Sequence, residues 1–141
     1  MKHISILSLF LTLTAAVALS CSKMDDNGDL GGNWQLTEWR NMVADTVVAT
    51  NSSRIYFTVQ KELVKLQCLD AAVYYLATFR HTADSLCLET IYQQPYDSVV
   101  APSDLTASLG VDATGRFHID ALSSEHLVLS TPSARLTFRK Y

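Results

Sequence analysis

The sequence predicts an all-β protein, an eight-stranded antiparallel up-and-down β-barrel with one short helix. Two observations lead to this fold class. Apolar and polar residues alternate with a period of two through most of residues 32–141, as in strands that bury one face. When short turns join neighbouring segments, the apolar faces also stay in register. Closing such a sheet into a barrel, rather than folding it as a sandwich, removes its exposed edges.

The first twenty residues have the pattern of a secretory signal peptide. Lys2 is the only charged residue in this segment, and the uncharged apolar run 4–19 follows it. A short basic region followed by such a run is typical of export signals. Cys21 comes directly after this segment and is taken as the first residue of the mature chain. The alternative is an ordinary secreted protein in which this cysteine has no special role.

The mature chain is expected to hold one domain on a short tether. Removal of Lys2 with the signal changes the formal net charge from −3 to −4. Nucleic-acid binding is therefore excluded as a main function, because it needs clustered basic residues. Glycines and acidic residues after Cys21 predict a flexible, solvated segment. The chain divides into a signal peptide at 1–20, an acidic tether at 21–31 and a barrel domain at 32–141.

Eight strands are expected, at residues 33–40, 54–60, 62–68, 72–80, 85–92, 116–122, 126–131 and 134–140. A turn at Lys61-Glu62 pairs Phe57 with Leu66, and the next loop places Tyr75 opposite Leu66 on its other side. Short antiparallel links of this kind favour a meander.

The remaining registers follow from loop length in the same way. A loop at 81–84 brings Phe79 against Leu86 and Tyr75 against Thr90. The last three strands are expected to pair Phe117 and Ile119 with Leu129 and Leu127, and these leucines in turn with Leu136 and Phe138.

The inward positions contain no charged residue, so general acid–base catalysis inside the barrel lacks its groups. We therefore predict a protein that is not an enzyme and needs no cofactor. An eight-stranded barrel is just wide enough to be filled by side chains or to hold one small ligand. The large aromatic residues favour a largely filled interior, and any ligand would be apolar. The candidate cavity-lining residues are Trp34, Phe57, Leu66, Tyr75, Phe79, Leu88, Thr90, Phe117 and Phe138.

The long connection at 93–115 predicts a short helix over Pro102–Gly110. Ser103 is expected to cap it, and the glycine to end it. Leu105 and Leu109 are four residues apart and share one helix face. We expect this pair at the barrel mouth, either as a permanent seal or as a lid for a ligand.

Cys68 and Cys87 are predicted to be free thiols. The registers separate them by about 17 Å along one strand, whereas a disulfide tolerates about 7 Å between Cα atoms. They are also expected to face opposite sides of the sheet, with Cys68 inward and Cys87 outward.

No metal or catalytic site is predicted. The histidines lack partners at zinc-ligand spacing. His118 and Asp120 share a strand face near Ser123, but no nucleophile elbow or oxyanion glycine accompanies them. They are interpreted as solvated surface.

Four large residues are expected on the outer surface, where they could form a patch for a partner protein. Scattered exposed apolar residues are also normal, so the patch is one of two interpretations. These residues are Trp39, Tyr56, Tyr74 and Leu76.

Two segments of the domain resemble a known family. Gly32-Asn33-Trp34 resembles the G-x-W signature of lipocalins, and residues 125–141 are similar to the end of lipocalin-like domains in bacterial surface lipoproteins. This resemblance implies an eight-stranded barrel and binding of a small apolar ligand. It also implies that an arginine of the last strand, Arg135 or Arg139, packs across Trp34.

The amino terminus resembles a bacterial lipoprotein signal, in which the cysteine after the apolar run is lipid-modified. Acyl chains on Cys21 would anchor the protein in a membrane without a spanning helix. Asp25 and Asp26 resemble an export signal to the outer leaflet of the outer membrane.

The expected function is thus a lipid-anchored, non-enzymatic binding protein of the bacterial cell envelope. The alternative is an accessory protein that contacts an envelope partner through the outer surface of a filled barrel.

Overall fold

The computed structural model describes residues 27–141, so the expected signal peptide, Cys21 and most of the tether lie outside the described residues. Within residues 27–141, no helix is both long and apolar enough to cross a membrane. The eight expected strands are all present. They are β1 (Gly32–Asn41), β3 (Ile55–Gln60), β4 (Leu63–Cys68), β5 (Tyr74–His81), β6 (Ser85–Gln94), β8 (Arg116–Leu122), β9 (His126–Ser130) and β10 (Ala134–Lys140).

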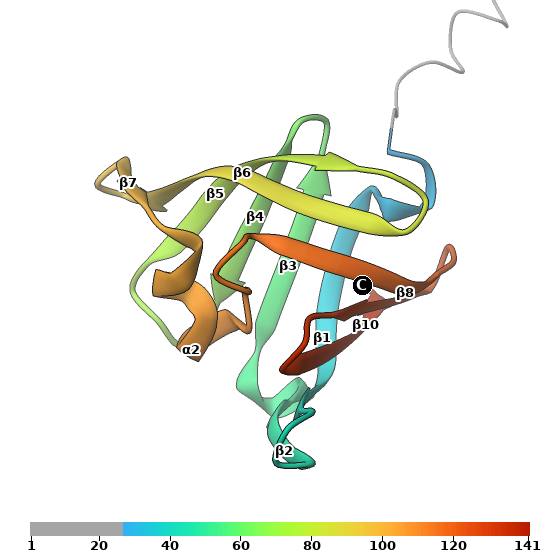
Figure 1. Cartoon of the computed structure of the whole chain (residues 1–141). Helices are drawn as coiled ribbons and strands as arrows, with labels where there is room; N and C mark the ends of the chain where they lie inside the picture. The colour runs from blue at the N-terminus through green and yellow to red at the C-terminus, as the bar shows by residue number, and fades with distance from the viewer. Residues whose placement is uncertain (1–26) are drawn as a thin grey trace, which may run out of the picture.

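These strands form a closed antiparallel barrel (Figure 1). Each barrel strand pairs with its neighbour in the chain, and β10 pairs with β1 to close the ring. Two further strands were not predicted. β2 (Thr46–Thr50) pairs with the second half of β1, and β7 (Ser98–Val100) pairs with the end of β6. The all-β, eight-stranded prediction is therefore confirmed, with two short additional strands.

Three of the expected registers are confirmed. Phe57 pairs with Leu66, Leu66 with Tyr75 on its other side, and Leu136 with Leu129. In each case the connecting turn is short, so its length fixes which residues face each other.

Two expected registers are wrong because the turns lie further along the chain than expected: Phe79 pairs with Leu88 rather than Leu86, and Leu127 pairs with Leu122 rather than Ile119. A β-bulge also lies in each pair of strands. In β6 an extra residue lies between Leu88, which pairs with Phe79, and Ile91, which pairs with Ala77. In β8 the extra residue Asp120 lies between Ile119, which pairs with Leu129, and Ala121, which pairs with Val128. A bulge places two residues of one strand against one residue of the other, so the inward face changes from even to odd positions in β6 and from odd to even positions in β8.

A third bulge corrects the prediction for the first strand. β1 gains an extra residue at Thr37, between the pairs Leu36–Phe138 and Glu38–Thr137. Trp39 therefore turns inward, where it pairs with Leu136 and is 8% exposed. The outer patch expected around Trp39 consequently lacks its tryptophan.

The two ends of the barrel differ in what closes them. The turns at 61–62, 82–84 and 123–125 lie at one end with residues 27–31, and we call this the Trp34 end. The turns at 42–45, 51–54, 69–73, 95–97 and 131–133 lie at the other end with the helical segment of the 93–115 connection, and we call this the helix end.

The last residues of the expected tether belong to the folded domain. A 3₁₀ helix, η2 (Gly28–Leu30), precedes β1, and Leu30 is fully buried. The indole Nε1 of Trp34 donates to the Leu30 carbonyl at 2.8 Å, and the amide of Asn27 donates to the Lys61 carbonyl at 2.9 Å. A single buried leucine among glycines and polar residues gives no periodic signal, which explains why the sequence did not predict this segment.

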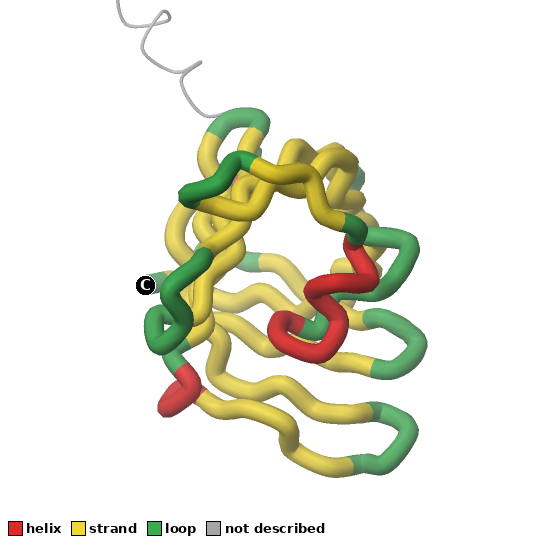
Figure 2. Tube along the Cα trace, turned by 90° about the vertical axis from the view of Figure 1, so that its left-hand side faces the viewer, coloured by secondary structure: helices red, strands yellow, loops and turns green. Residues whose placement is uncertain are grey.

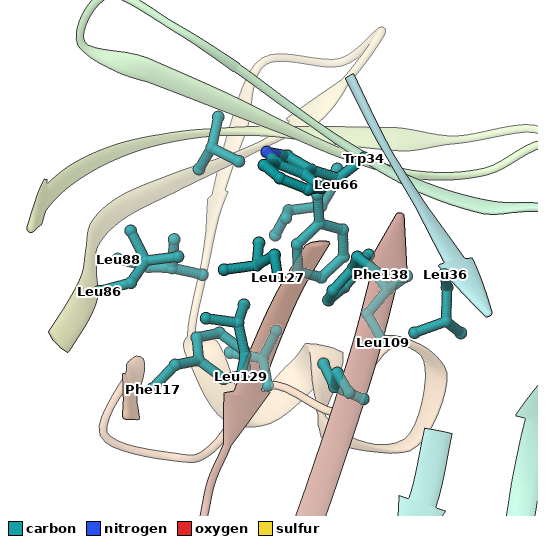
Figure 3. Close-up of a cluster of buried hydrophobic side chains, with 14 of the residues drawn as sticks. Trp34, Leu36, Leu66, Leu86, Leu88, Leu109, Phe117, Leu127, Leu129 and Phe138 are labelled. Atoms are coloured by element: carbon teal, nitrogen blue, oxygen red, sulfur yellow. The ribbon is translucent and has the colours of Figure 1, made fainter. Parts of the chain in front are cut away.

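The interior is filled by apolar side chains from all eight barrel strands (Figure 3). The rings of Phe57 and Phe138 lie 4.8 Å apart. The largest fully buried side chains are Trp34, Phe57, Phe117, Phe138, Leu30, Leu36, Leu66, Leu86, Ile91, Leu105, Leu127 and Leu129. A side chain without exposed surface touches no space that a water molecule could enter, so these residues pack against one another.

Gly115 is the glycine for which the fold has the strictest requirement. Its φ of +73° lies in the left-handed region, and an added Cβ would lie 2.8 Å from the Leu88 carbonyl oxygen. We expect Gly115→Ala to lower the free energy of unfolding by at least about 2 kcal/mol in urea titrations. Gly28→Ala is the control, because Gly28 has φ +55° and open space around its Cβ position. Equal losses in the two variants would contradict the steric argument.

Candidate functional site

The candidate site is the helix end of the barrel, where a short helical segment closes the ring of strands (Figure 2). The segment consists of a 3₁₀ helix, η4 (Pro102–Leu105), followed directly by one α-helical turn, α2 (Thr106–Leu109). Leu105, Leu109 and the following Val111 are all buried in the core. The short helix and the burial of Leu105 and Leu109 agree with the expectation from the sequence.

The start of the helical segment is held differently from the expectation. Ala101, not Ser103, occupies the cap position, and Asp104 Oδ2 accepts the Ala101 N–H at 3.0 Å. Pro102 suits the first helical position because its missing N–H needs no partner there. Gly110 ends the helix with φ +70°, as predicted.

Hydrogen bonds also fix the return from the helix to β8. The Thr106 hydroxyl donates to the Val111 carbonyl at 2.5 Å, and the Thr114 hydroxyl donates to Asp112 Oδ2 at 2.5 Å. The side-chain and backbone hydrogen bonds from Thr114 lower the pKa of Asp112 below its ordinary value. In the described chain, every buried side-chain nitrogen and oxygen has a hydrogen-bond partner.

Half-buried side chains lie around this closed end. Cys68 ends β4 and Tyr75 lies near the start of β5, while Ala49 and Val100 come from the two additional strands. All four pack against the core but keep some exposed surface. The sequence did not indicate the last two, because neither β2 nor β7 was predicted.

The candidate cavity-lining residues separate into two groups. Trp34, Phe57, Leu66, Leu88, Phe117 and Phe138 are buried in the core, whereas Tyr75 and Phe79 are half-buried. Thr90 does not point into the barrel. Because of the β6 bulge, Ile91 is the inward residue there; it pairs with Ala77 and is fully buried. The Thr90 N–H donates instead to the Thr78 hydroxyl at 3.1 Å.

At the Trp34 end, a lysine takes the place expected for an arginine. Lys140 Nζ lies 4.3 Å from the centroid of the Trp34 ring and donates to the Asp29 and Gly31 carbonyls at 3.0 and 2.5 Å. Lys140 lies two residues after Phe138 and four after Leu136, so alternation along β10 puts it on the same inward face. This spacing in the sequence could have identified Lys140 as the residue that contacts Trp34.

Neither Arg135 nor Arg139 packs on Trp34 as the resemblance implied. Both are exposed on the outer face of β10. Arg139 donates from Nε and Nη2 to Gln35 Oε1, at 2.9 and 2.8 Å. The Gln35 amide in turn donates to the Tyr56 hydroxyl at 3.3 Å.

Cys68 and Cys87 are both free in the structure. Cys68 packs against the core and donates to the Ser53 carbonyl at 3.4 Å. Cys87 instead accepts a hydrogen bond from Arg116 Nε at 3.4 Å on the outer face. Cys87 pairs with Arg80, because the β5–β6 register differs from the expected one.

The polar cluster near His118 does not have the connections of a catalytic triad. His118 Nδ1 lies 2.6 Å from Asp120 Oδ1, and Ser130 donates to the same oxygen at 3.0 Å. Ser123 is occupied by accepting the N–H groups of its own turn. No serine in residues 27–141 is hydrogen-bonded to the His118 ring. The same part of the chain holds no group of three or more side chains suited to a metal.

The closed eight-stranded barrel with a helix across one end defines the chain as a protein of the lipocalin fold class. A family model, described as a lipocalin-like domain, matches residues 12–141. The chain therefore belongs to the lipocalin-like domain family. No curated protein matches it.

Solved structures support the fold. A lipocalin-like protein from Bacteroides uniformis matches with a TM-score of 0.60 and 21% identity, over 81% of this chain and 100% of its own length. An uncharacterized protein from Bacteroides eggerthii matches with a TM-score of 0.54 and 19% identity, over 79% and 98%. A protein from Burkholderia xenovorans, solved by NMR, matches with a TM-score of 0.55 and 14% identity, over 84% and 83%.

The contacts of Lys140 predict a measurable role in stability. We expect Lys140→Met, which keeps most of the side-chain stem, to lower the free energy of unfolding by about 1–2 kcal/mol through loss of the cation–π contact and two charge-assisted hydrogen bonds. Lys65→Met is the matched control, because Lys65 lies 4.5 Å from the Tyr74 ring centroid on the outer face. A loss in the control equal to that of Lys140→Met would contradict this role.

Proposed function

We propose that this protein is a non-enzymatic binding protein of the bacterial cell envelope that takes up a small apolar ligand at the helix end. Acyl chains on Cys21 anchor it in the outer membrane. Membership of the lipocalin-like family supports the binding role, because proteins of this family are generally binding proteins. Anchoring rests on the sequence pattern before Cys21.

The observation that carries this proposal is the apolar plug at the helix end. Leu105, Leu109 and Val111 come from a connection outside the barrel ladder, and they occupy its interior. Because these side chains are apolar, a ligand of the same chemistry can replace them when the segment moves outward. The half-buried Tyr75 supplies a hydroxyl group beside the same end.

A second candidate follows from the filled interior. Trp34, Phe117 and Phe138 have no exposed surface, so the closed state offers no space beside them. A protein that keeps this state uses its outer surface, as an accessory module that contacts an envelope partner. The two functions differ in whether the plug opens.

Binding of a fluorescent apolar probe distinguishes the two functions. Leu109→Ala removes part of the plug, so we expect it to raise probe affinity at least about fivefold by creating apolar space. Leu127→Ala removes an equally buried leucine of β9 away from the helix and serves as the control. Because each change leaves a cavity, thermal unfolding must show that both variants are folded at the assay temperature. Absence of probe binding in the wild-type protein and in Leu109→Ala would favour the outer-surface function.

Lipid anchoring is tested by mass spectrometry of the native protein. We expect an amino-terminal peptide that begins at Cys21 and carries the added mass of acyl chains. Cys21→Ser removes the acceptor thiol, so the amino-terminal peptide of this variant is expected without the added mass. An unmodified Cys21, or a mature chain that begins at Ser22 or later, would contradict the anchor.

A further inference from the structure

The exposed large apolar side chains are distributed unequally between the two ends of the barrel. In residues 27–141, seven of nine lie at or beside the helix end, and two lie toward the Trp34 end. The two are Leu63 and Tyr141. The seven are Met42, Val43, Val47, Val48, Leu69, Tyr96 and Val99.

Several of the seven occupy the tips of separate turns. Met42 and Val43 begin the turn of the β1–β2 hairpin, which projects beyond β3 in Figure 1. Tyr96 lies in the turn between β6 and β7. Val43 is 81% exposed and Tyr96 74%. The turns at the Trp34 end, 61–62, 82–84 and 123–125, consist instead of charged and small residues.

The carboxylates at the helix end have partners within the chain. Asp45 pairs with Arg40 at 3.2 Å, and Asp70 pairs with Arg54 at 3.0 Å. Asp97 accepts the Gln94 amide at 3.0 Å, and Asp104 and Asp112 hold the helical segment as described above. The charges at this end are thus partly satisfied by the protein itself, which lowers the cost of bringing it to a less polar surface.

We propose that the helix end docks on a lipid surface, with the tips of its turns inserted at the interface between headgroups and acyl chains. Apolar residues on several separate tips fit a fluid surface, which adapts to each side chain. A protein partner would need one contiguous complementary patch. Because two of the carboxylates are paired with arginines, the fitting surface is zwitterionic and not strongly charged.

This contact does not require the acyl anchor, which joins the domain through residues 27–31 at the Trp34 end, opposite the docking end. The docking contact also indicates a source for the ligand, and this part of the proposal rests on the proposed function. The plug formed by Leu105, Leu109 and Val111 lies at the docking end, so an apolar molecule could pass from the lipid phase into the barrel without crossing water.

Vesicle co-flotation tests the docking surface. The mature chain with Cys21→Ser, which carries no acyl chains, is mixed with large unilamellar phosphatidylcholine vesicles. We expect the protein to float with the vesicles. Val43→Glu is expected to lower the partition coefficient about tenfold or more, because it puts a charge where docking would bury an apolar side chain in the lipid interface. Met42→Glu acts in the same direction.

Leu63→Glu is the matched control. Leu63 is 43% exposed and Met42 46%, so the two changes are alike except for the end of the barrel. Circular dichroism confirms that each variant is folded. The proposal is overturned if the parent Cys21→Ser chain stays free of vesicles, as it would with a protein partner, or if Leu63→Glu reduces binding as much as Met42→Glu. Probe binding without vesicles tests the ligand function separately.

Discussion

The pairing of β10 with β1 is the interaction on which the rest of the structure depends. It gives every barrel strand two neighbours, so one face of the whole sheet is enclosed. The enclosed face then excludes water from a core that includes Trp34 and Phe138, which come from the two closing strands. The Lys140 ammonium group covers the Trp34 ring at the end of this pairing.

The sequence predicted the strands well because apolar alternation and short turns are local signals. It could not predict the bulges, since an extra residue such as Thr37 is chosen by the fit between strands and not by its own side chain. Beyond each bulge, the inward positions change from even to odd residue numbers or the reverse. This reversal explains why Trp39 and Ile91 are buried although alternation assigned Trp39 to the surface and Thr90 to the interior.

The candidate site was also predictable only where local sequence signals determine it. Leu105 and Leu109 followed from helical spacing between Pro102 and Gly110, which are local signals. Val111 and Val100 did not, because their burial depends on how the 93–115 connection folds back on the barrel. Likewise β2 is a strand only because β1 extends beyond β3 and offers it an edge.

The filled interior limits which ligands can open the barrel. Withdrawing Leu105, Leu109 and Val111 exposes three apolar side chains, at a cost of about 1.5–3 kcal/mol each and roughly 5–9 kcal/mol together. A ligand shifts the equilibrium only if its own burial exceeds this amount. An acyl chain of about twelve methylenes supplies roughly 10 kcal/mol, at about 0.8 kcal/mol for each buried methylene. A small polar molecule supplies far less, so the closed state would persist in its presence.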